Sequence, residues 1–235
     1  MFLETLFYEP VLFFRVLMVV VLSICLHELA HGWAALSQGD DTPETAGHMT
    51  LNPVVHLGVP SLIFLCVAGI AWGAMPVNPE KFRDRKWGNI WVSAAGPLMN
   101  LSLGNAFVSL LWLIETFSLD AIVSWEFLYL AASLNFLLFL FNLLPLPPLD
   151  GFHVASELLP ALKPLRNTPI GFFALMVIFM NPDFASGLRF ASRYTIGWLL
   201  LYPIALGLAA AIVAVTIVTF AIALPSLRKK QRDRS

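Results

Sequence analysis

The sequence predicts an all-α polytopic membrane protein, a bundle of about five to six transmembrane helices with a short re-entrant or interfacial hairpin. Composition is the first reason. Of the 235 residues, 58% are hydrophobic and only 12% are charged, which is about half the charged fraction of soluble domains. The second reason is patterning, because the apolar residues occur in long runs that can cross about 30 Å of hydrocarbon.

Five of these runs are long enough, or nearly so, to be transmembrane helices. They lie at about 11–36, 90–115, 125–145, 168–182 and 195–224, and the fourth is the shortest. A sixth apolar run, 57–73, contains Gly58, Pro60 and Gly69 and is the candidate hairpin. No gap between the runs is long enough for a further soluble domain, so residues 1–235 are expected to form a single membrane domain.

The distribution of Lys and Arg predicts the orientation in the membrane. The loops 74–89 and 146–167 and the C-terminal tail 226–235 carry basic residues, so these segments are expected on the cytoplasmic side. With five spans, the N-terminus then lies outside and the first span ends in the cytoplasm. A full crossing by 57–73 would put the end of the first span opposite the 146–167 loop, so we predict that 57–73 does not cross.

The first apolar run contains a metal-ligand motif. Val16 to Leu26 is almost entirely apolar and leads directly into His27-Glu28-Leu29-Ala30-His31, an H-E-x-x-H sequence. Residues four apart lie on one face of a helix, so His27 and His31 can bind one zinc ion with Glu28 beside it as general base. Ionisable groups are costly within an apolar span, which also indicates a functional site.

A zinc hydrolase site usually has three protein ligands, so one ligand must come from elsewhere in the chain. The best candidate is Asp150, which follows three prolines at 145–148. These prolines predict that the preceding helix stops near Leu143 or Leu144 and that an extended strip delivers Asp150 to the interior. Asp150 could instead cap the next helix, and His153 is a rival ligand. Three acidic residues remain as alternatives: Glu115, Glu126 and Glu157.

Small and polar residues of the second span indicate helix packing. Ala94, Ala95, Gly96 and Gly104 predict a face for close helix–helix contact. Asn100 and Asn105 are expected to form hydrogen bonds between helices rather than to act in catalysis.

These motifs together resemble those of the site-2 protease family of intramembrane zinc metalloproteases. The resemblance rests on H-E-x-x-H in a transmembrane helix and on N-x-x-P-x-P-P-L-D-G, which begins at Asn142. The segments 47–56 and 76–100 also resemble short bacterial and archaeal members, and this chain has no room for the PDZ or CBS domain of other members. The resemblance covers about residues 15–155, and residue 48 is His where many relatives have Arg.

The resemblance implies a zinc-dependent intramembrane endopeptidase that takes part in regulated intramembrane proteolysis. It implies one Zn²⁺ per chain with His27, His31 and Asp150 as ligands, and Glu28 as the residue that activates the zinc-bound water. Asn142 is implied as a polar partner near the active site, and we expect it either to stabilise the oxyanion or to form an interhelical hydrogen bond.

Hydropathy and charge, together with the resemblance over residues 15–155, predict the organisation and setting of the chain. The catalytic core is expected at about 11–160, followed by C-terminal helices at about 165–225 and a basic cytoplasmic tail at 226–235. The expected location is the plasma (inner) membrane of a prokaryote, where the partners are the lipid bilayer and transmembrane protein substrates. A substrate helix must unwind to expose its carbonyls, so we expect unpaired backbone at 145–149 and at 50–52 to bind it as an added strand.

Other functions fit the sequence less well. The formal net charge is −1 and basic residues are not concentrated outside the tail, so no nucleic-acid partner is expected. A metal transporter would carry polar residues through several spans, whereas the ionisable groups here lie at one depth. A catalytically silent scaffold would typically lack Glu28 or a ligand. The sequence indicates no oligomeric state and leaves the roles of His48, His56 and His153 open.

Overall fold

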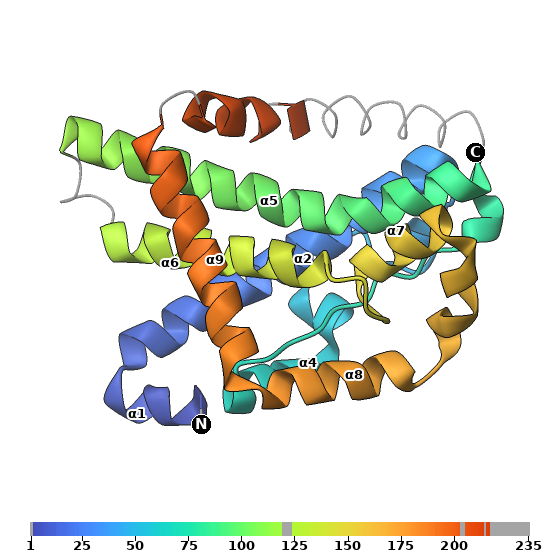
Figure 1. The fold of residues 1–235 in the computed structure, drawn as a ribbon, viewed down its shortest axis with the longest axis horizontal. Coiled ribbons are helices and arrows are strands. Elements are labelled where there is room, and N and C mark those ends of the chain that lie inside the picture. Colours follow the sequence, from blue (N-terminus) through green and yellow to red (C-terminus); the bar gives the residue numbers. More distant parts are fainter. Residues whose placement is uncertain (1, 119–123, 203–204, 214, 217–235) are drawn as a thin grey trace.

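The computed structural model describes residues 2–118, 124–202, 205–213 and 215–216, and these contain helices and loops but no β-strand. Figure 1 shows the helices in chain order. The elements are η1 (Phe2–Glu4), α1 (Thr5–Tyr8), α2 (Pro10–Gln38), α3 (Thr42–Thr45), α4 (Pro53–Ala68), η2 (Pro79–Lys81), α5 (Arg85–Phe117), α6 (Trp125–Asn142), α7 (Asp150–Leu158), η3 (Pro160–Asn167), α8 (Ile170–Met180) and α9 (Pro182–Leu201).

Three helices in the described part of the chain, α2, α5 and α6, are long and apolar enough to cross a membrane. A fourth span results if Asp183–Leu201 and Ala205–Val213, which meet at an angle of 108°, are one broken span. The fold class is therefore confirmed, with three to four helices of spanning length where about five to six were expected.

The differences from the expected spans lie in the C-terminal third. The fourth predicted span, 168–182, forms the 11-residue helix α8, which is shorter than the ~20 residues that a perpendicular span requires. The predicted span at 195–224 begins inside α9, and its residues 203–204, 214 and 217–224 lie outside the described residues. The basic tail 226–235 also lies outside them.

Local sequence determines where the long helices begin and end. Helix α2 starts with Pro10 at its first position and ends at Gly39, whose φ of 97° requires a residue without a Cβ. Helix α5 is capped by Asp84, whose side chain accepts a hydrogen bond from the backbone N of Trp87 at 2.8 Å. Helix α6 ends at Asn142, directly before the proline-rich segment, as the sequence predicted.

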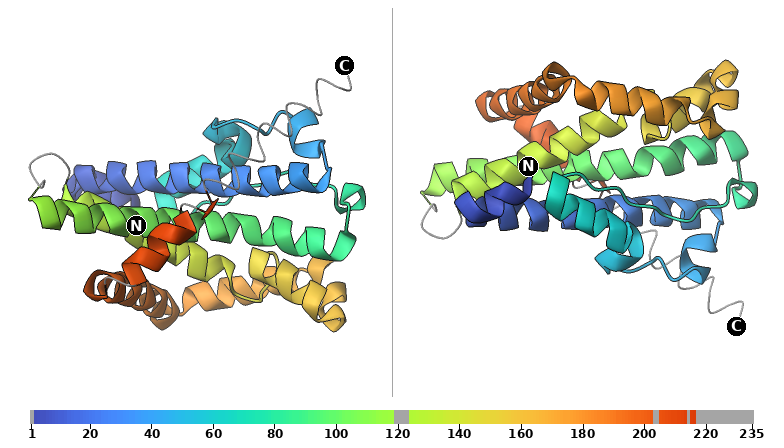
Figure 2. Two further views of the ribbon diagram at one scale, coloured as in Figure 1. Left: turned by 90° about the horizontal axis from the view of Figure 1, so that it is seen from above. Right: turned by 90° about the horizontal axis from the view of Figure 1, so that it is seen from below.

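The three long helices run side by side and form the body of the molecule, and α9 crosses α6 at a steep angle (Figures 1 and 2). Helices α5 and α6 approach closely at Gly104, where a Cβ would lie 3.0 Å from the ring of Phe136. This close approach agrees with the predicted small-residue face at Gly104. Buried apolar side chains fill the space between α5, α6 and α9: Val108, Ala132, Phe136, Ile196 and Leu199.

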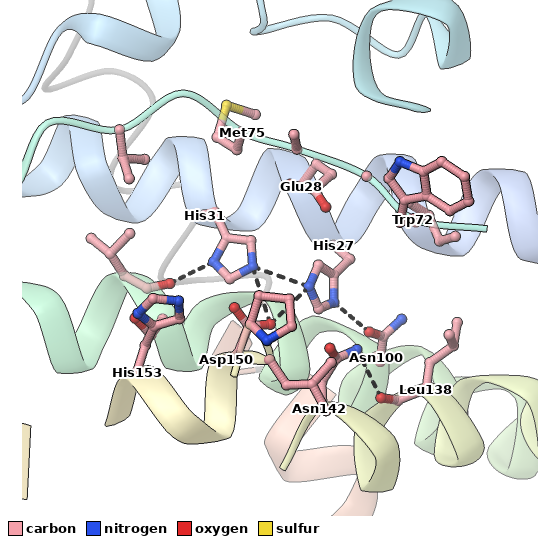
Figure 3. A pocket seen from close by; sticks show the side chains of 18 of the residues that line it. His27, Glu28, His31, Trp72, Met75, Asn100, Leu138, Asn142, Asp150 and His153 are labelled. Atoms are coloured by element: carbon pink, nitrogen blue, oxygen red, sulfur yellow. Dashed lines mark hydrogen bonds and ion pairs between the residues drawn. The ribbon is translucent and has the colours of Figure 1, made fainter. Parts of the chain in front are cut away.

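The predicted hairpin at 57–73 consists of α4 and the start of an extended segment, 70–78. Helix α4 has 16 residues and is interrupted at Gly58, whose backbone has a φ of 70° and a ψ of 161°. It ends at Gly69 in the left-handed conformation. Segment 70–78 then runs back past α2 (Figure 3), so the hairpin places main chain against the H-E-x-x-H motif.

Candidate metal centre and active site

The motif residues His27, Glu28 and His31 lie in the C-terminal half of α2 and are buried, with exposed fractions of 7%, 7% and 8%. They line a pocket of about 610 Å³ that is bounded by α2, segment 70–78, α5, α6 and the start of α7. Figure 3 shows the two imidazole rings pointing into this pocket. Their common direction follows from the four-residue spacing on one helix face.

Asp150 meets the two histidines from the other side of the pocket. It is the first residue of α7, where the helix N-terminus favours a negative charge. The start of α7 packs directly on the end of α6, because a Cβ on Gly151 would collide with the carbonyl group of Leu143. The turn between α6 and α7 therefore positions the carboxylate of Asp150 opposite the two histidines. The side chain of Asp150 does not cap α7.

The three side chains present one ligand atom each to a common point. Nε2 of His27 and Nε2 of His31 are 3.0 Å apart, and Oδ2 of Asp150 is 3.1 Å from the first and 3.4 Å from the second. Ligands at the usual bond length to a tetrahedral zinc ion lie about 3.3 Å from one another. The donor set and its spacing therefore fit a zinc ion, with one coordination position left for water.

Gly96 of α5 leaves the room that such an ion requires. A Cβ built on Gly96 would collide with Nε2 of both His27 and His31. The glycine was interpreted from the sequence as part of a helix-packing face, but in the structure it faces the metal ligands. A methyl group at this position would occupy the space beside Nε2 of both histidines.

The second nitrogen of each imidazole has a fixed partner on α5. Nδ1 of His27 lies 2.6 Å from Oδ1 of Asn100, and Nδ1 of His31 donates to the carbonyl oxygen of Val92 at 2.6 Å. Such partners orient metal-binding histidines and leave Nε2 free for the metal. The sequence predicted Asn100 only as a partner in hydrogen bonds between helices and did not assign it to the site.

Glu28 lies beneath the main chain of segment 70–78. A Cβ on Gly73 would be 2.5 Å from Oε1 of Glu28 and 2.8 Å from its Cγ, so only glycine fits here without displacing the carboxylate. The segment is held by hydrogen bonds to α4: the backbone of Trp72 bonds the hydroxyl of Ser61 through both its N–H and its carbonyl oxygen. The backbone N–H of Ala74 donates to the carbonyl oxygen of His56 at 3.0 Å.

The other edge of this segment faces the pocket. Gly73 and Met75 line the pocket, and within the described structure their backbone N–H and carbonyl groups have no hydrogen-bond partner. Successive residues of an extended chain direct these groups to opposite sides. The backbone groups of Trp72 and Ala74 therefore bond α4, whereas those of Gly73 and Met75 are available to hydrogen-bond another extended chain. Segment 70–78 therefore has the free edge of a β-strand.

The two segments expected to bind substrate as an added strand are less suitable. At 145–149, Leu146 and Leu149 donate their N–H groups to Leu144 and Leu146 in tight turns, and the prolines have no N–H to give. At 50–52, the carbonyl oxygen of Thr50 accepts a hydrogen bond from Nε2 of His56 at 2.6 Å. In both segments these backbone groups are used in contacts with residues nearby in the sequence.

Asn142 lines the same pocket. Its amide nitrogen donates to the carbonyl oxygen of Leu138 at 3.0 Å, within its own helix, and among the described residues it forms no interhelical hydrogen bond. The side chain lies near Asp150 and His27 (Figure 3). The second amide hydrogen of Asn142 remains available to a ligand in the pocket.

The alternative ligands lie elsewhere or are bound to other groups. His153 lines the pocket, but the three ligand atoms that meet belong to His27, His31 and Asp150. Glu157 is buried and forms ion pairs with Lys163 at 2.7 Å and Arg166 at 2.9 Å. Two further acidic residues accept hydrogen bonds at the far end of the bundle: Glu115 from Trp125 and Glu126 from Ser124.

The chain is similar to a peptidase family and to proteins named as candidate zinc metalloproteases. Residues 113–181 match Peptidase family M50. YwhC of Bacillus subtilis, which is named as a candidate zinc metalloprotease, is 37% identical over 172 residues, covering 69% of this chain and 78% of YwhC. Rip2 of Mycolicibacterium smegmatis, named in the same way, is 34% identical over 69% of this chain and 65% of its own length. Rip2 of Mycobacterium tuberculosis is 30% identical over 189 residues, covering 74% of this chain and 71% of that Rip2. No solved structure gives a significant match.

Proposed function

This chain belongs to peptidase family M50, the site-2 protease family, and from that membership we propose that it is a zinc-dependent endopeptidase acting on membrane proteins. The observation that carries the proposal is the meeting of His27, His31 and Asp150 at one point of a pocket that also contains Glu28. The ligands come from helices of an apolar bundle, so the substrates we propose are peptide bonds in or near transmembrane segments.

In this proposal His27, His31 and Asp150 hold one zinc ion per chain. When bound, zinc supplies a Lewis acid that acidifies water and polarises a peptide carbonyl group. Glu28 accepts the proton of the attacking water and delivers it to the leaving amine. Asn142 donates its second amide hydrogen to the developing oxyanion, because its first is already given to Leu138.

Segment 70–78 binds the substrate in extended form. The free N–H and carbonyl groups of Gly73 and Met75 are two residues apart, which is the period at which one strand bonds another. A substrate added along this edge passes between the segment and the metal ligands, with Glu28 beside it. This arrangement explains why a helical substrate must unwind before it is cut.

We further propose that residues 1–235 act as a single catalytic membrane domain in regulated intramembrane proteolysis. The basic loops 74–89 and 146–167 support a cytoplasmic position for the nearby end of α2. The bacterial relatives support the plasma (inner) membrane of a prokaryote, and the basic residues of the tail support a cytoplasmic C-terminus.

The test combines zinc content with cleavage. Purified wild-type protein in detergent is expected to contain about one zinc per chain, and Asp150→Ala is expected to contain much less. Wild-type protein with zinc is expected to cut labelled single-span membrane proteins, whereas Glu28→Gln retains zinc and does not cut. Glu80→Gln is the matched control, because Glu80 is exposed and its ion pair with Arg85, at 3.9 Å, is a loose surface contact. Absence of zinc from the wild type, or cutting by Glu28→Gln, would refute the proposal.

A further inference from the structure

A chain of hydrogen bonds connects His27 to a residue two helices away. Nδ1 of His27 contacts Oδ1 of Asn100 at 2.6 Å, and Nδ2 of Asn100 donates to Oδ1 of Asn135 at 3.2 Å. Nδ2 of Asn135 donates in turn to the backbone carbonyl oxygen of Ala131 at 2.9 Å. Both asparagines are completely buried, with exposed fractions of 0%.

The last acceptor in this series of hydrogen bonds, the carbonyl oxygen of Ala131, determines the direction of every bond in the series. The carbonyl oxygen of Ala131 can only accept, so the amide group of Asn135 must present its NH₂ there and its oxygen to Asn100. Asn100 must then present its NH₂ to Asn135 and its oxygen to His27. An amide oxygen can only accept, so Nδ1 of His27 must carry a hydrogen, and in the neutral imidazole Nε2 then carries the lone pair.

We propose that Asn135 is a positioning residue that, through Asn100, fixes the tautomer of His27 in which Nε2 is ready to bind the metal. Asn135 does not itself line the pocket, and its side chain bonds Asn100 and Ala131 rather than a metal ligand. Without it, Asn100 could turn its NH₂ toward His27, and the imidazole could then carry its hydrogen on Nε2. This role rests on the proposed zinc site and adds a residue of α6 to it.

The packing around the two asparagines holds them at this distance. Gly104 lies one turn after Asn100 on α5, and a Cβ there would press on the ring of Phe136, the neighbour of Asn135. Glycine therefore allows α5 and α6 to approach closely enough for the two amide groups to bond. Both amide groups are shielded from bulk solvent, which leaves protein groups as their hydrogen-bond partners.

The first test reads the tautomer directly and needs neither zinc nor activity. Metal-free protein labelled with ¹⁵N-histidine is studied in detergent micelles by long-range ¹H–¹⁵N correlation, with the His27 signals assigned from His27→Gln. The expected result is His27 with its hydrogen on Nδ1 in the wild type. A wild-type His27 with a hydrogen on Nε2 and none on Nδ1 would overturn the proposal without any variant having to fold.

The second test compares two substitutions at position 135. In Asn135→Leu both bonds are lost, and we expect mixed His27 tautomers and a zinc affinity, measured by chelator competition, about tenfold weaker. In Asn135→Asp a protonated carboxyl group can donate to Ala131 and accept from Asn100, so tautomer and affinity should stay near the wild type. Asn105→Leu is the matched control, because Asn105 is a buried asparagine of α5 outside the chain of bonds.

The outcomes separate this proposal from the proposed function. Equal disruption by Asn135→Leu and Asn135→Asp would mean a merely structural role and would overturn it, as would wild-type tautomer and affinity in Asn135→Leu. A wild type that binds no zinc but holds His27 in the Nδ1–H form would support the hydrogen-bond chain and refute the zinc protease.

Discussion

Gly73 lies directly over Glu28, so close that the carboxylate of Glu28 occupies the place where a side chain of residue 73 would begin. The proposed general base and the proposed substrate-binding edge are therefore in contact with one another. A substrate strand bonded to Gly73 is brought beside Glu28 by the same contact. Substitution of Gly73 therefore tests the position of the proposed general base as directly as substitution of Glu28 does.

Gly73→Ala is expected to reduce the cleavage rate by about a hundredfold while leaving zinc content unchanged. The added methyl group must displace either Glu28 or segment 70–78, and misplacement of a catalytic group by about 1 Å costs about this much. Cleavage of a labelled single-span substrate and zinc content measure the two effects. Gly187→Ala is the control, because a Cβ there meets nothing within 4 Å. An unimpaired Gly73→Ala enzyme would contradict the close approach.

Gly96→Ala is expected to weaken zinc binding by at least about tenfold. Its methyl group would occupy the space between Nε2 of His27 and Nε2 of His31, so the ion and the methyl group exclude each other. Chelator competition measures the affinity. Gly197→Ala is the matched control in α9, where a Cβ meets nothing within 4 Å. Equal zinc affinity in the two variants would show that Gly96 does not face the metal.

Asp40→Ala is expected to raise the KM for substrate and to lower the free energy of unfolding by about 1.5–3 kcal/mol. Asp40 has an exposed fraction of 0%, and its carboxylate accepts from the backbone N–H of Asn78 at 2.7 Å and of Thr42 at 3.0 Å. These bonds anchor one end of segment 70–78 to the end of α2.

Asp41→Ala provides the comparison for Asp40→Ala. Asp41 forms an exposed ion pair with Lys81, and exposed pairs contribute at most about 1 kcal/mol. Kinetics and thermal unfolding in detergent should therefore show a small effect for Asp41→Ala and a larger one for Asp40→Ala. The anchoring role would be rejected if both variants kept the wild-type KM.

Glu157→Gln is expected to destabilise the protein in a way that depends on pH. Burial by itself would raise the pKa of Glu157, but hydrogen bonds from Lys163 and Arg166 outweigh it and hold the pKa below its ordinary value. A lowered pKa contributes stability above the unfolded pKa of about 4.3, and this contribution is lost as the pH falls through the folded pKa.

The difference in melting temperature between wild type and Glu157→Gln should therefore be largest above about pH 5 and shrink below about pH 4. Thermal unfolding in detergent at a series of pH values measures it. Glu80→Gln should show no such trend, because Glu80 is an exposed residue in a loose surface pair. A constant difference across the series would mean that the charge of Glu157 does not stabilise the fold.

The sequence predicted the parts of the site that depend on local rules. His27 and His31 share a helix face because of their spacing, and α6 ends at Asn142 because prolines follow it. These two predictions required only the geometry of one helix or one turn. Asp150 was the best candidate for the third ligand, but local sequence left a capping role and His153 open, and the resemblance to the site-2 protease family selected Asp150.

The remaining parts depend on how distant segments approach, which spacing along the chain does not determine. Gly96 has the composition of a packing residue, and only its position opposite α2 shows that it faces the histidines. Asn100 was expected to form a hydrogen bond between helices, and its amide nitrogen does donate to Asn135 on α6. Its amide oxygen, however, contacts Nδ1 of His27. Helix α8 was expected to span because its residues are apolar, yet an apolar run of 11 helical residues can also pack on the side of a bundle.

The position of His31 near one end of α2 has a consequence for how deeply a substrate must enter. His31 is seven residues before Gln38, the last residue of α2, which corresponds to about 10 Å along the helix. An extended chain covers that distance with about three residues. Each residue unwound in lipid exposes backbone groups at a cost of several kcal/mol, so a shallow site confines that cost to about one turn of the substrate helix.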